Sequence, residues 1–262
     1  MRWLVVNAAP DLREQINRET ALHPKTGLRS SPIAGVILTN GDVDAVAGLL
    51  NLRERTPFSI YAHARILEVL EANPIFGVLA PDVVRRVPCT LEETFVPRDV
   101  GGNDIGLRVT PFAVPGKIAL FMEDAHDSDD FGTQEGDTVG LEFSDAEGSA
   151  RLLYIANCAR LTDMLCARCN GADLLFFDGT LWRDDEMVVS REGQKTGQRM
   201  GHIFMTGPRG SIAGLAELAL GRRIFIHINN TNPVLLSDSA ERRELEAAGW
   251  EVAYDGMELT LP

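Results

Sequence analysis

Three apolar stretches of the sequence each run into side chains that bind metals or transfer protons. Asp42 and Asp44 follow the first stretch, Asp178 ends the second and His227 ends the third. In α/β folds the loops beyond the carboxyl ends of strands converge on one crevice, so these side chains are expected to lie close together. Carboxylates combined with an imidazole suit a divalent metal. The pattern predicts a metal site.

Each of these residues also has a purely structural explanation. Asp44 precedes an apolar helical pattern and would serve as its N-cap. Asp178 comes before Gly179 and would shape a turn. His227 would be a core histidine that donates to a carbonyl group. Taken together, their shared position at strand ends favours the functional interpretation.

A second group of polar residues lies between glycines in the segment 195–211. It contains Lys195, Arg199, His202 and Arg209 and comes just before a helical pattern. Such a loop can close over a ligand and hold its carboxylates through charge-assisted hydrogen bonds. The alternative is a solvated surface loop that leads into the helix.

The cysteines do not form a disulfide framework in a chain of this length. Cys166 and Cys169 form a CxxC pair within a helical pattern, where they share one face. The preferred interpretation is a pair of small core-facing side chains. A zinc site would need two more ligands, and Cys158 is the nearby candidate.

Apolar periodicity predicts alternating strands and helices, which is typical of an α/β protein with a mixed sheet covered by helices. We expect one domain over residues 1–262. Strands are predicted at 2–6, 33–39, 58–62, 106–114, 118–122, 138–143, 151–156, 173–178, 223–228 and 250–254. Helices are predicted at 12–19, 44–55, 64–73, 161–169, 212–220 and 239–249.

The composition excludes several classes of partner. The 262-residue chain has a formal net charge of −13 and a pI of about 4.8, without a cluster of basic residues that could track phosphates. Nucleic acid is therefore not expected as a partner. No apolar run has the length of a membrane span, and the first residues lack a signal-peptide pattern. A cytoplasmic protein that does not insert into membranes is expected.

Longer stretches of the sequence resemble a known family. These stretches include LTNGDVDAVAGLLNLRE, VPGKIALFMEDA, FGTQEGDTVGL, LFFDGTLWRDDEM, KTGQRMGH and IFIHINNTNPVL. In their residues and in their order along the chain they resemble the pyrroloquinoline quinone biosynthesis protein B family, from near Asn7 to the C-terminus. The resemblance implies a metallo-β-lactamase-like αβ/βα sandwich of two mixed sheets flanked by helices. It also implies iron-dependent, oxygen-using hydroxylation of the tyrosine ring in a cross-linked Glu-Tyr precursor; the alternative is a carrier that helps to export the product to the periplasm.

The resemblance also assigns site residues. The HxHxDH metal motif of the fold falls on Asn40, Asp42, Asp44 and Ala45, so only the aspartate of the motif is kept. The resemblance places Asp178 at the aspartate that usually bridges metals and His227 at the final histidine. It thus implies metal ligation by these two residues with Asp42 and Asp44, and catalytic roles for Asp44, Asp178 and His227.

Two departures from the family pattern bear on activity. The N-terminal strands of the family, with a cysteine cluster that can hold structural zinc, have no counterpart in this sequence. Ala45 removes an imidazole, so weak Fe(II) binding is expected unless His202 replaces it, and Ala45→His is expected to tighten binding. Zinc, or no tightly bound metal, are the alternatives to Fe(II). Hydrolysis of phosphodiesters or β-lactams is not expected, because the motif offers no histidine to generate a metal-bound hydroxide.

The remaining expectations concern the ligand and the partners. Charge and loop position suggest that Lys195, Arg199 and His202 bind the substrate together with Asn40. The resemblance implies a small or peptide-derived pyrroloquinoline quinone intermediate as that substrate. Other proteins of the same biosynthesis and a second copy of the chain are the macromolecular partners that we consider.

Overall fold

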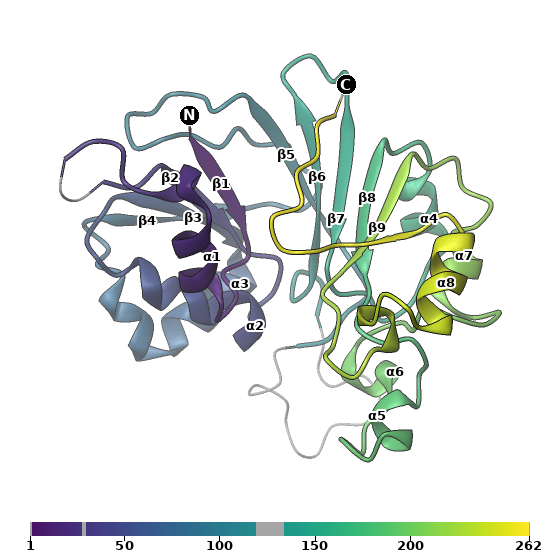
Figure 1. Ribbon diagram of the computed structural model, residues 1–262. Helices are drawn as coiled ribbons and strands as arrows, with labels where there is room; N and C mark the ends of the chain where they lie inside the picture. The colour runs from purple at the N-terminus through teal and green to yellow at the C-terminus, as the bar shows by residue number, and fades with distance from the viewer. Residues whose placement is uncertain (1, 28–29, 119–133, 262) are drawn as a thin grey trace. The chain divides into compact units, whose positions relative to one another are not determined.

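The computed structural model describes residues 2–27, 30–118 and 134–261 (Figure 1). This part of the chain forms two compact units. The first contains residues 2–113, 118 and 134–139, and the second contains residues 114–117 and 140–261. Each unit has its own strands and helices, which confirms the predicted α/β class. The strand predicted at 118–122 lies, apart from Ile118, outside the described residues.

The first unit is built on a parallel sheet in which the strand order β1-β2-β3-β4 follows the sequence. Its strands are β1 (Trp3–Val6), β2 (Ile33–Ile37), β3 (Phe58–His63) and β4 (Val84–Cys89), with β5 (Leu107–Ala113) later in the chain. Its helices are α1 (Leu12–Arg18), η1 (Thr20–Leu22), α2 (Val43–Val46), η2 (Ala47–Leu52), α3 (Ala64–Ala72) and η3 (Pro74–Val78). All residues of β2 are buried, as expected for a parallel strand covered on both faces.

The helix predicted at 44–55 is replaced by the short α2 and the 3₁₀ segment η2. Gly48 approaches the loop after β1 so closely that a Cβ atom would lie 2.1 Å from the carbonyl oxygen of Ala9. The same loop is bound by the Gly48 amide, which donates to the Ala8 carbonyl at 2.7 Å. The expected N-cap is also wrong: Asp42 precedes the helix, and Asp44 lies within its first turn.

In the second unit the strands β6 to β10 follow the order β10-β9-β8-β7-β6. The strands are β6 (Val139–Asp145), β7 (Arg151–Ile155), β8 (Leu174–Asp178), β9 (Arg222–Ile226) and β10 (Glu251–Val252). β6 and β7 form an antiparallel hairpin, and the remaining pairs among these strands are parallel. The helices are α4 (Asp163–Cys169), α5 (Glu186–Val189), α6 (Gly197–Met200), α7 (Ser211–Gly214), η5 (Pro233–Leu235) and α8 (Ala240–Ala247).

The central strands of this sheet are held by a closely packed core. Phe177 on β8 is fully buried and contacts the ring of Phe225 on β9 edge to face, with ring centroids 6.5 Å apart. Phe225 in turn stacks on Trp250, with centroids 4.0 Å apart. Burial of these large rings fixes the ends of β8 and β9. The residues that follow both strands therefore continue from strand ends that packing holds in place.

The CxxC segment lies in α4, whose N-cap Thr162 accepts a hydrogen bond from the Leu165 amide. Cys169 is fully buried and Cys166 is half-buried, so the pair faces the core in part. Among the described residues, no group of three metal-binding side chains includes a cysteine. Within the same residues, no helix is both long and apolar enough to cross a membrane.

Candidate metal centre

The pairing register of β8 and β9 brings Asp178 and His227 together. The two strands are parallel, and Asp178 pairs with Ile226, the last residue of β9. The pairing continues one step further, because the Gly179 amide donates to the Ile226 carbonyl at 2.8 Å. His227 is therefore adjacent to Asp178 at the carboxyl edge of the sheet, as predicted for side chains that end neighbouring parallel strands.

Gly179 allows this close approach. A Cβ atom at this position would lie 2.9 Å from each of three atoms: the Ile226 carbonyl oxygen, the Met205 methyl carbon and the Phe225 Cβ. Two of these belong to β9 itself, so a larger residue would push the two strand ends apart. The glycine after Asp178 is thus needed for packing between the strands that carry the site.

His202 reaches the same edge from a segment that follows α6. That helix begins at a Thr196 cap and ends at Gly201, which has the left-handed φ of 84° that favours glycine. The His202 amide donates to the Gly197 carbonyl at 2.9 Å, and the Ile203 amide donates to the Cys158 carbonyl at 2.5 Å. These backbone bonds place the imidazole beside the end of β8.

The Asp178 carboxylate is fully buried and accepts hydrogen bonds on both oxygens. Its Oδ2 accepts from the Cys158 amide at 2.8 Å and lies 2.7 Å from His202 Nδ1. Its Oδ1 accepts from the Thr180 hydroxyl at 2.6 Å and from the Thr180 amide at 3.1 Å. These hydrogen bonds satisfy a buried polar group that would otherwise be costly to bury.

The Thr180 hydroxyl links the carboxylate to both histidines. Its Oγ1 lies 2.9 Å from His227 Nδ1 and 3.0 Å from His202 Nδ1. A hydroxyl has one proton, and the short contact with the charged Asp178 oxygen takes it. Both Nδ1 atoms therefore face oxygen atoms of Thr180 and Asp178, and a metal held among the three side chains would replace the protons of these contacts.

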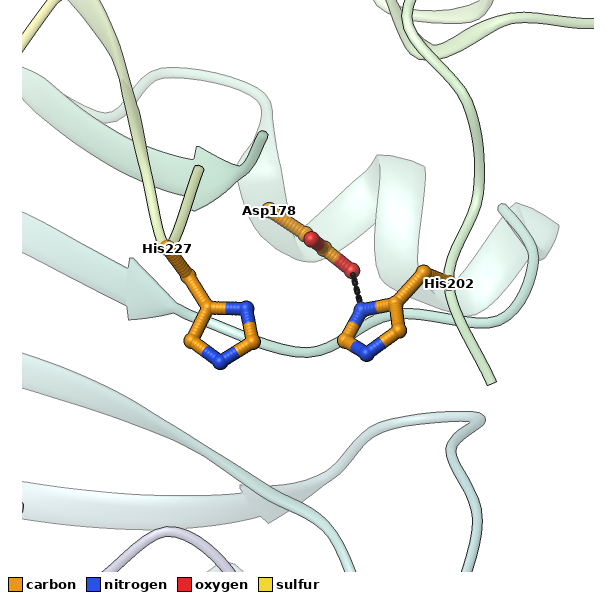
Figure 2. Close-up of side chains that lie close together, drawn as sticks. All are labelled: Asp178, His202 and His227. Atoms are coloured by element: carbon orange, nitrogen blue, oxygen red, sulfur yellow. Dashed lines mark hydrogen bonds and ion pairs between the residues drawn. The ribbon is translucent and has the colours of Figure 1, made fainter. Parts of the chain in front are cut away.

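Two imidazoles and a carboxylate thus form one group. One ligand atom from each of Asp178, His202 and His227 lies within 4.8 Å of the others. The two rings are nearly parallel, with centroids 5.3 Å apart and an interplanar angle of 22°. Figure 2 shows both rings beside the carboxylate, with the second nitrogen of each ring pointing away from it. This donor set fits a divalent metal such as Fe(II) or zinc.

The backbone of His227 supports a functional interpretation of this group. His227 has a φ of 53°, in the left-handed region that a residue with a side chain rarely adopts, and its side chain is exposed. The Asn229 amide, two residues further on, donates to the Thr180 carbonyl at 3.1 Å. Such conformations cost about 1–3 kcal/mol and cluster at functional sites.

The other motif residues lie in the first unit. Asn40 is buried, and its Oδ1 accepts from the Asp42 amide at 3.0 Å. Asp44 is exposed in the first turn of α2. Ala45 is 2% exposed, and its carbonyl accepts from the Ala8 amide at 2.7 Å. An imidazole in place of Ala45 would have to displace packed atoms, so Ala45→His carries a folding cost of about 1–3 kcal/mol.

The basic residues of segment 195–211 separate into two sets. Lys195 lies before α6 and is half-buried, whereas Arg199 is exposed on that helix. His202 and Arg209 instead line a cavity of about 300 Å³ within the second unit. His202 therefore both contacts the Asp178 carboxylate and lines this cavity.

Thr180 is the site residue that the sequence analysis missed. Its hydroxyl contacts all three members of the group, and its amide binds Asp178. A hydroxyl two residues after an aspartate often forms such a turn, so the DGT sequence carried a usable signal.

Comparison with known proteins places the fold in one class. A family model described as a beta-lactamase superfamily domain matches residues 2–228. A diphosphatase from the PhnP family shares the fold, with a TM-score of 0.65 at 19% identity over 100% of this chain and 81% of that chain. The chain is thus a member of the β-lactamase superfamily.

Closer relatives identify the family. The coenzyme PQQ synthesis protein B of Rhodopseudomonas palustris is 54% identical over 99% of this chain and 84% of its own length. The protein of the same name from Gluconacetobacter diazotrophicus is 53% identical over 98% and 83%. A crystal structure of zinc-bound PqqB from Methylobacterium extorquens superposes with a TM-score of 0.92 at 53% identity, over 99% of this chain and 84% of that one. The chain belongs to the coenzyme PQQ synthesis protein B family.

Proposed function

We propose that the chain acts in pyrroloquinoline quinone biosynthesis as an Fe(II)-dependent hydroxylase of a tyrosine-derived intermediate. The observation that carries the proposal is the group formed by Asp178, His202 and His227. Two histidines and one carboxylate are the ligands of non-haem Fe(II) oxygenases. The zinc-bound structure of the Methylobacterium extorquens relative supports metal binding in this family.

The residues of the group have distinct roles in this proposal. His202 and His227 would hold the metal as nitrogen ligands, and Asp178 would hold it as the carboxylate ligand. Thr180 fixes the ring of His227 through its Nδ1. When bound, Fe(II) would supply the activation of O₂. Hydroxylation would convert one ring C–H bond into C–OH, and the second oxygen atom would leave as water with two electrons from an added reductant and two protons from solvent.

His202 can also compensate for the imidazole that is missing at Ala45. The metal motif in the sequence has one imidazole too few unless His202 replaces it. The contact of His202 with Asp178 and the parallel arrangement of the two rings support this replacement. We therefore propose that His202 has a metal-binding role in addition to the substrate-binding role expected from its loop.

Oxygen consumption tests the proposed activity. The chain would be loaded with Fe(II) under argon and mixed with the cross-linked Glu-Tyr precursor and a reductant, and O₂ uptake and the mass of the product would be followed. We expect uptake together with a product 16 mass units heavier for each oxygen atom inserted. His227→Ala should abolish both, whereas His23→Ala, a histidine in the first unit, should not.

Two outcomes would contradict the hydroxylase. One is precursor binding without O₂ uptake in the Fe(II)-loaded chain, which would favour the carrier alternative. The other is uptake that His227→Ala leaves unchanged, which would place the chemistry away from this group.

A further inference from the structure

We propose that the cavity beside His202 is the substrate subsite and that Arg160 and Arg209 bind carboxylates of the ligand there. The cavity has a volume of about 300 Å³ and lies entirely within the second unit. Its lining contains His202, the two arginines and Gln198, together with the apolar residues Leu161, Ile203 and Phe204. This inference deepens the proposed function and rests on it for the identity of the ligand.

The charge of the lining indicates an anionic ligand. Two arginines line a cavity that no aspartate or glutamate lines, in a chain with a formal net charge of −13. Among the described residues, neither the Arg160 nor the Arg209 guanidinium has an ion pair or hydrogen bond. Both side chains belong to exposed residues and are available to a ligand. Arginine binds carboxylates through paired, charge-assisted hydrogen bonds.

The segment that carries Arg209 is held in place by its backbone. Phe204 forms a parallel bridge with Leu181, and the Ser211 amide donates to the Phe204 carbonyl at 2.9 Å. Gly210 is so close to this turn that a Cβ atom would lie 2.3 Å from the Met205 carbonyl oxygen. The turn that presents Arg209 therefore has a fixed position relative to the strand that contains Asp178.

The segment that carries Arg160 is tied directly to the metal centre. The Cys158 amide donates to Asp178 Oδ2 at 2.8 Å, and the Cys158 thiol contacts the Arg160 carbonyl at 3.3 Å. The Ala159 amide donates to the Pro115 carbonyl at 2.6 Å. Arg160 therefore lies two residues after Cys158, whose amide binds the Asp178 carboxylate of the metal centre.

The lining defines the chemical class of the ligand. Leu161, Ile203 and Phe204 offer apolar surface, whereas the arginines and Gln198 offer donors. An aromatic or heterocyclic molecule with carboxylates on its edge matches both, and the volume suits a small molecule rather than a folded partner. Arg160 and Arg209 would then perform the task that charge alone suggested for Lys195 and Arg199.

Binding of pyrroloquinoline quinone itself tests the subsite. This compound carries carboxylates on a planar ring system, and its trimethyl ester has the same rings without those charges. Calorimetry would measure both probes with the full chain, with Arg160→Gln and Arg209→Gln, and with Arg13→Gln as a charge-matched control in the first unit. Circular dichroism would confirm that each variant folds.

We expect each subsite variant to weaken binding of the acid by on the order of tenfold, the loss expected for one charge-assisted interaction. Binding of the ester should be weak and equal in all variants, and Arg13→Gln should match the unchanged chain. Equal affinity of the acid in both subsite variants, or no binding of the acid to the unchanged chain, would overturn the proposal.

Metal binding separates this inference from the proposed function. Fe(II) titration of Arg160→Gln and Arg209→Gln should give the same affinity as the unchanged chain, because neither residue belongs to the metal group. Loss of probe affinity with intact Fe(II) binding supports the subsite. A chain that binds the probe through the arginines but binds no Fe(II) supports the subsite and contradicts the hydroxylase.

Discussion

Asp178 Oδ2 and His202 Nδ1 lie 2.7 Å apart at the carboxyl end of β8. The carboxylate is fully buried, and the His202 side chain is 12% exposed, so water screens this contact poorly. The contact joins the last residue of a rigid strand to a loop imidazole. It fixes the orientation of the ring, which a metal ligand requires.

Asp178→Asn tests the importance of the buried charge. Four donors from Cys158, Thr180 and His202 point at the carboxylate, and an amide replaces one acceptor oxygen by a donor. We expect the free energy of unfolding to fall by about 1–3 kcal/mol, the cost of an unsatisfied buried group.

The Asp178→Asn change should also lower metal affinity by more than the roughly 10–100-fold typical of a change in a hydrogen-bonding partner of a ligand. Urea unfolding and a metal titration measure the two effects. Unchanged metal affinity would remove Asp178 from the centre.

Thr180→Val tests whether the hydroxyl positions both rings. Valine has nearly the same shape but cannot bind Asp178 or accept from His202 and His227. Metal affinity should fall roughly 10–100-fold. Thr180→Ser keeps the hydroxyl and should restore most of the affinity. If the serine variant is as weak as the valine variant, packing of the Thr180 methyl group rather than the hydroxyl is responsible.

Glu142 allows a test of how the free energy of unfolding depends on pH. It lies on β6 and binds Arg151 on β7 at 2.8 Å and Arg168 on α4 at 2.9 Å. Burial raises the pKa of Glu142, but the hydrogen bonds and charges of the two arginines outweigh burial and hold the pKa below its ordinary value. Its stabilising effect is therefore present above the ordinary carboxyl pKa of about 4.3 and is lost as the pH falls through the lower folded value.

We expect Glu142→Gln to reduce the free energy of unfolding by about 1–2 kcal/mol at pH 7, since the groups are only partly exposed. The difference from the unchanged chain should shrink as the pH falls below about 4. Glu147→Gln, in the exposed turn between β6 and β7, is the matched control and should have little effect. A difference that grows on acidification would contradict the assignment.

The four thiols should differ in reactivity. Burial raises the pKa of Cys89 and of Cys169 to about 12 and that of Cys158 well above its ordinary value, so few thiolates form there. The pKa of Cys166 is also raised, but this residue is half-buried. Iodoacetamide at pH 8, followed by peptide mass analysis, should label Cys166 first. Equally fast labelling of Cys89 would show that its burial is not maintained in solution.

Sequence reasoning found the parts of the site that depend on strand ends. The apolar runs before Asp178 and His227 predicted β8 and β9, and neighbouring parallel strands bring such ends together by register alone. The hairpin of β6 and β7 and the helix α8 were equally clear from local pattern. These features need only short-range periodicity and turn chemistry.

The rest depends on contacts between residues far apart in the sequence. The grouping of His202 with Asp178 follows from the pairing of Ile203 with Cys158, which no local pattern encodes. The shortening of the helix after Asp42 follows from the contact of Gly48 with the loop after β1. Tertiary packing overrides local helix preference in such places.

Anaerobic Fe(II) titration with His202→Ala and His227→Ala tests the central claim most directly. The unchanged chain and the His23→Ala control should each bind one Fe(II) ion at this group. Each site variant should lose affinity by more than about 100-fold, because a ligand itself is removed. Fe(II) affinity that remains unchanged in both site variants would contradict the assignment of Asp178, His202 and His227 as the metal centre.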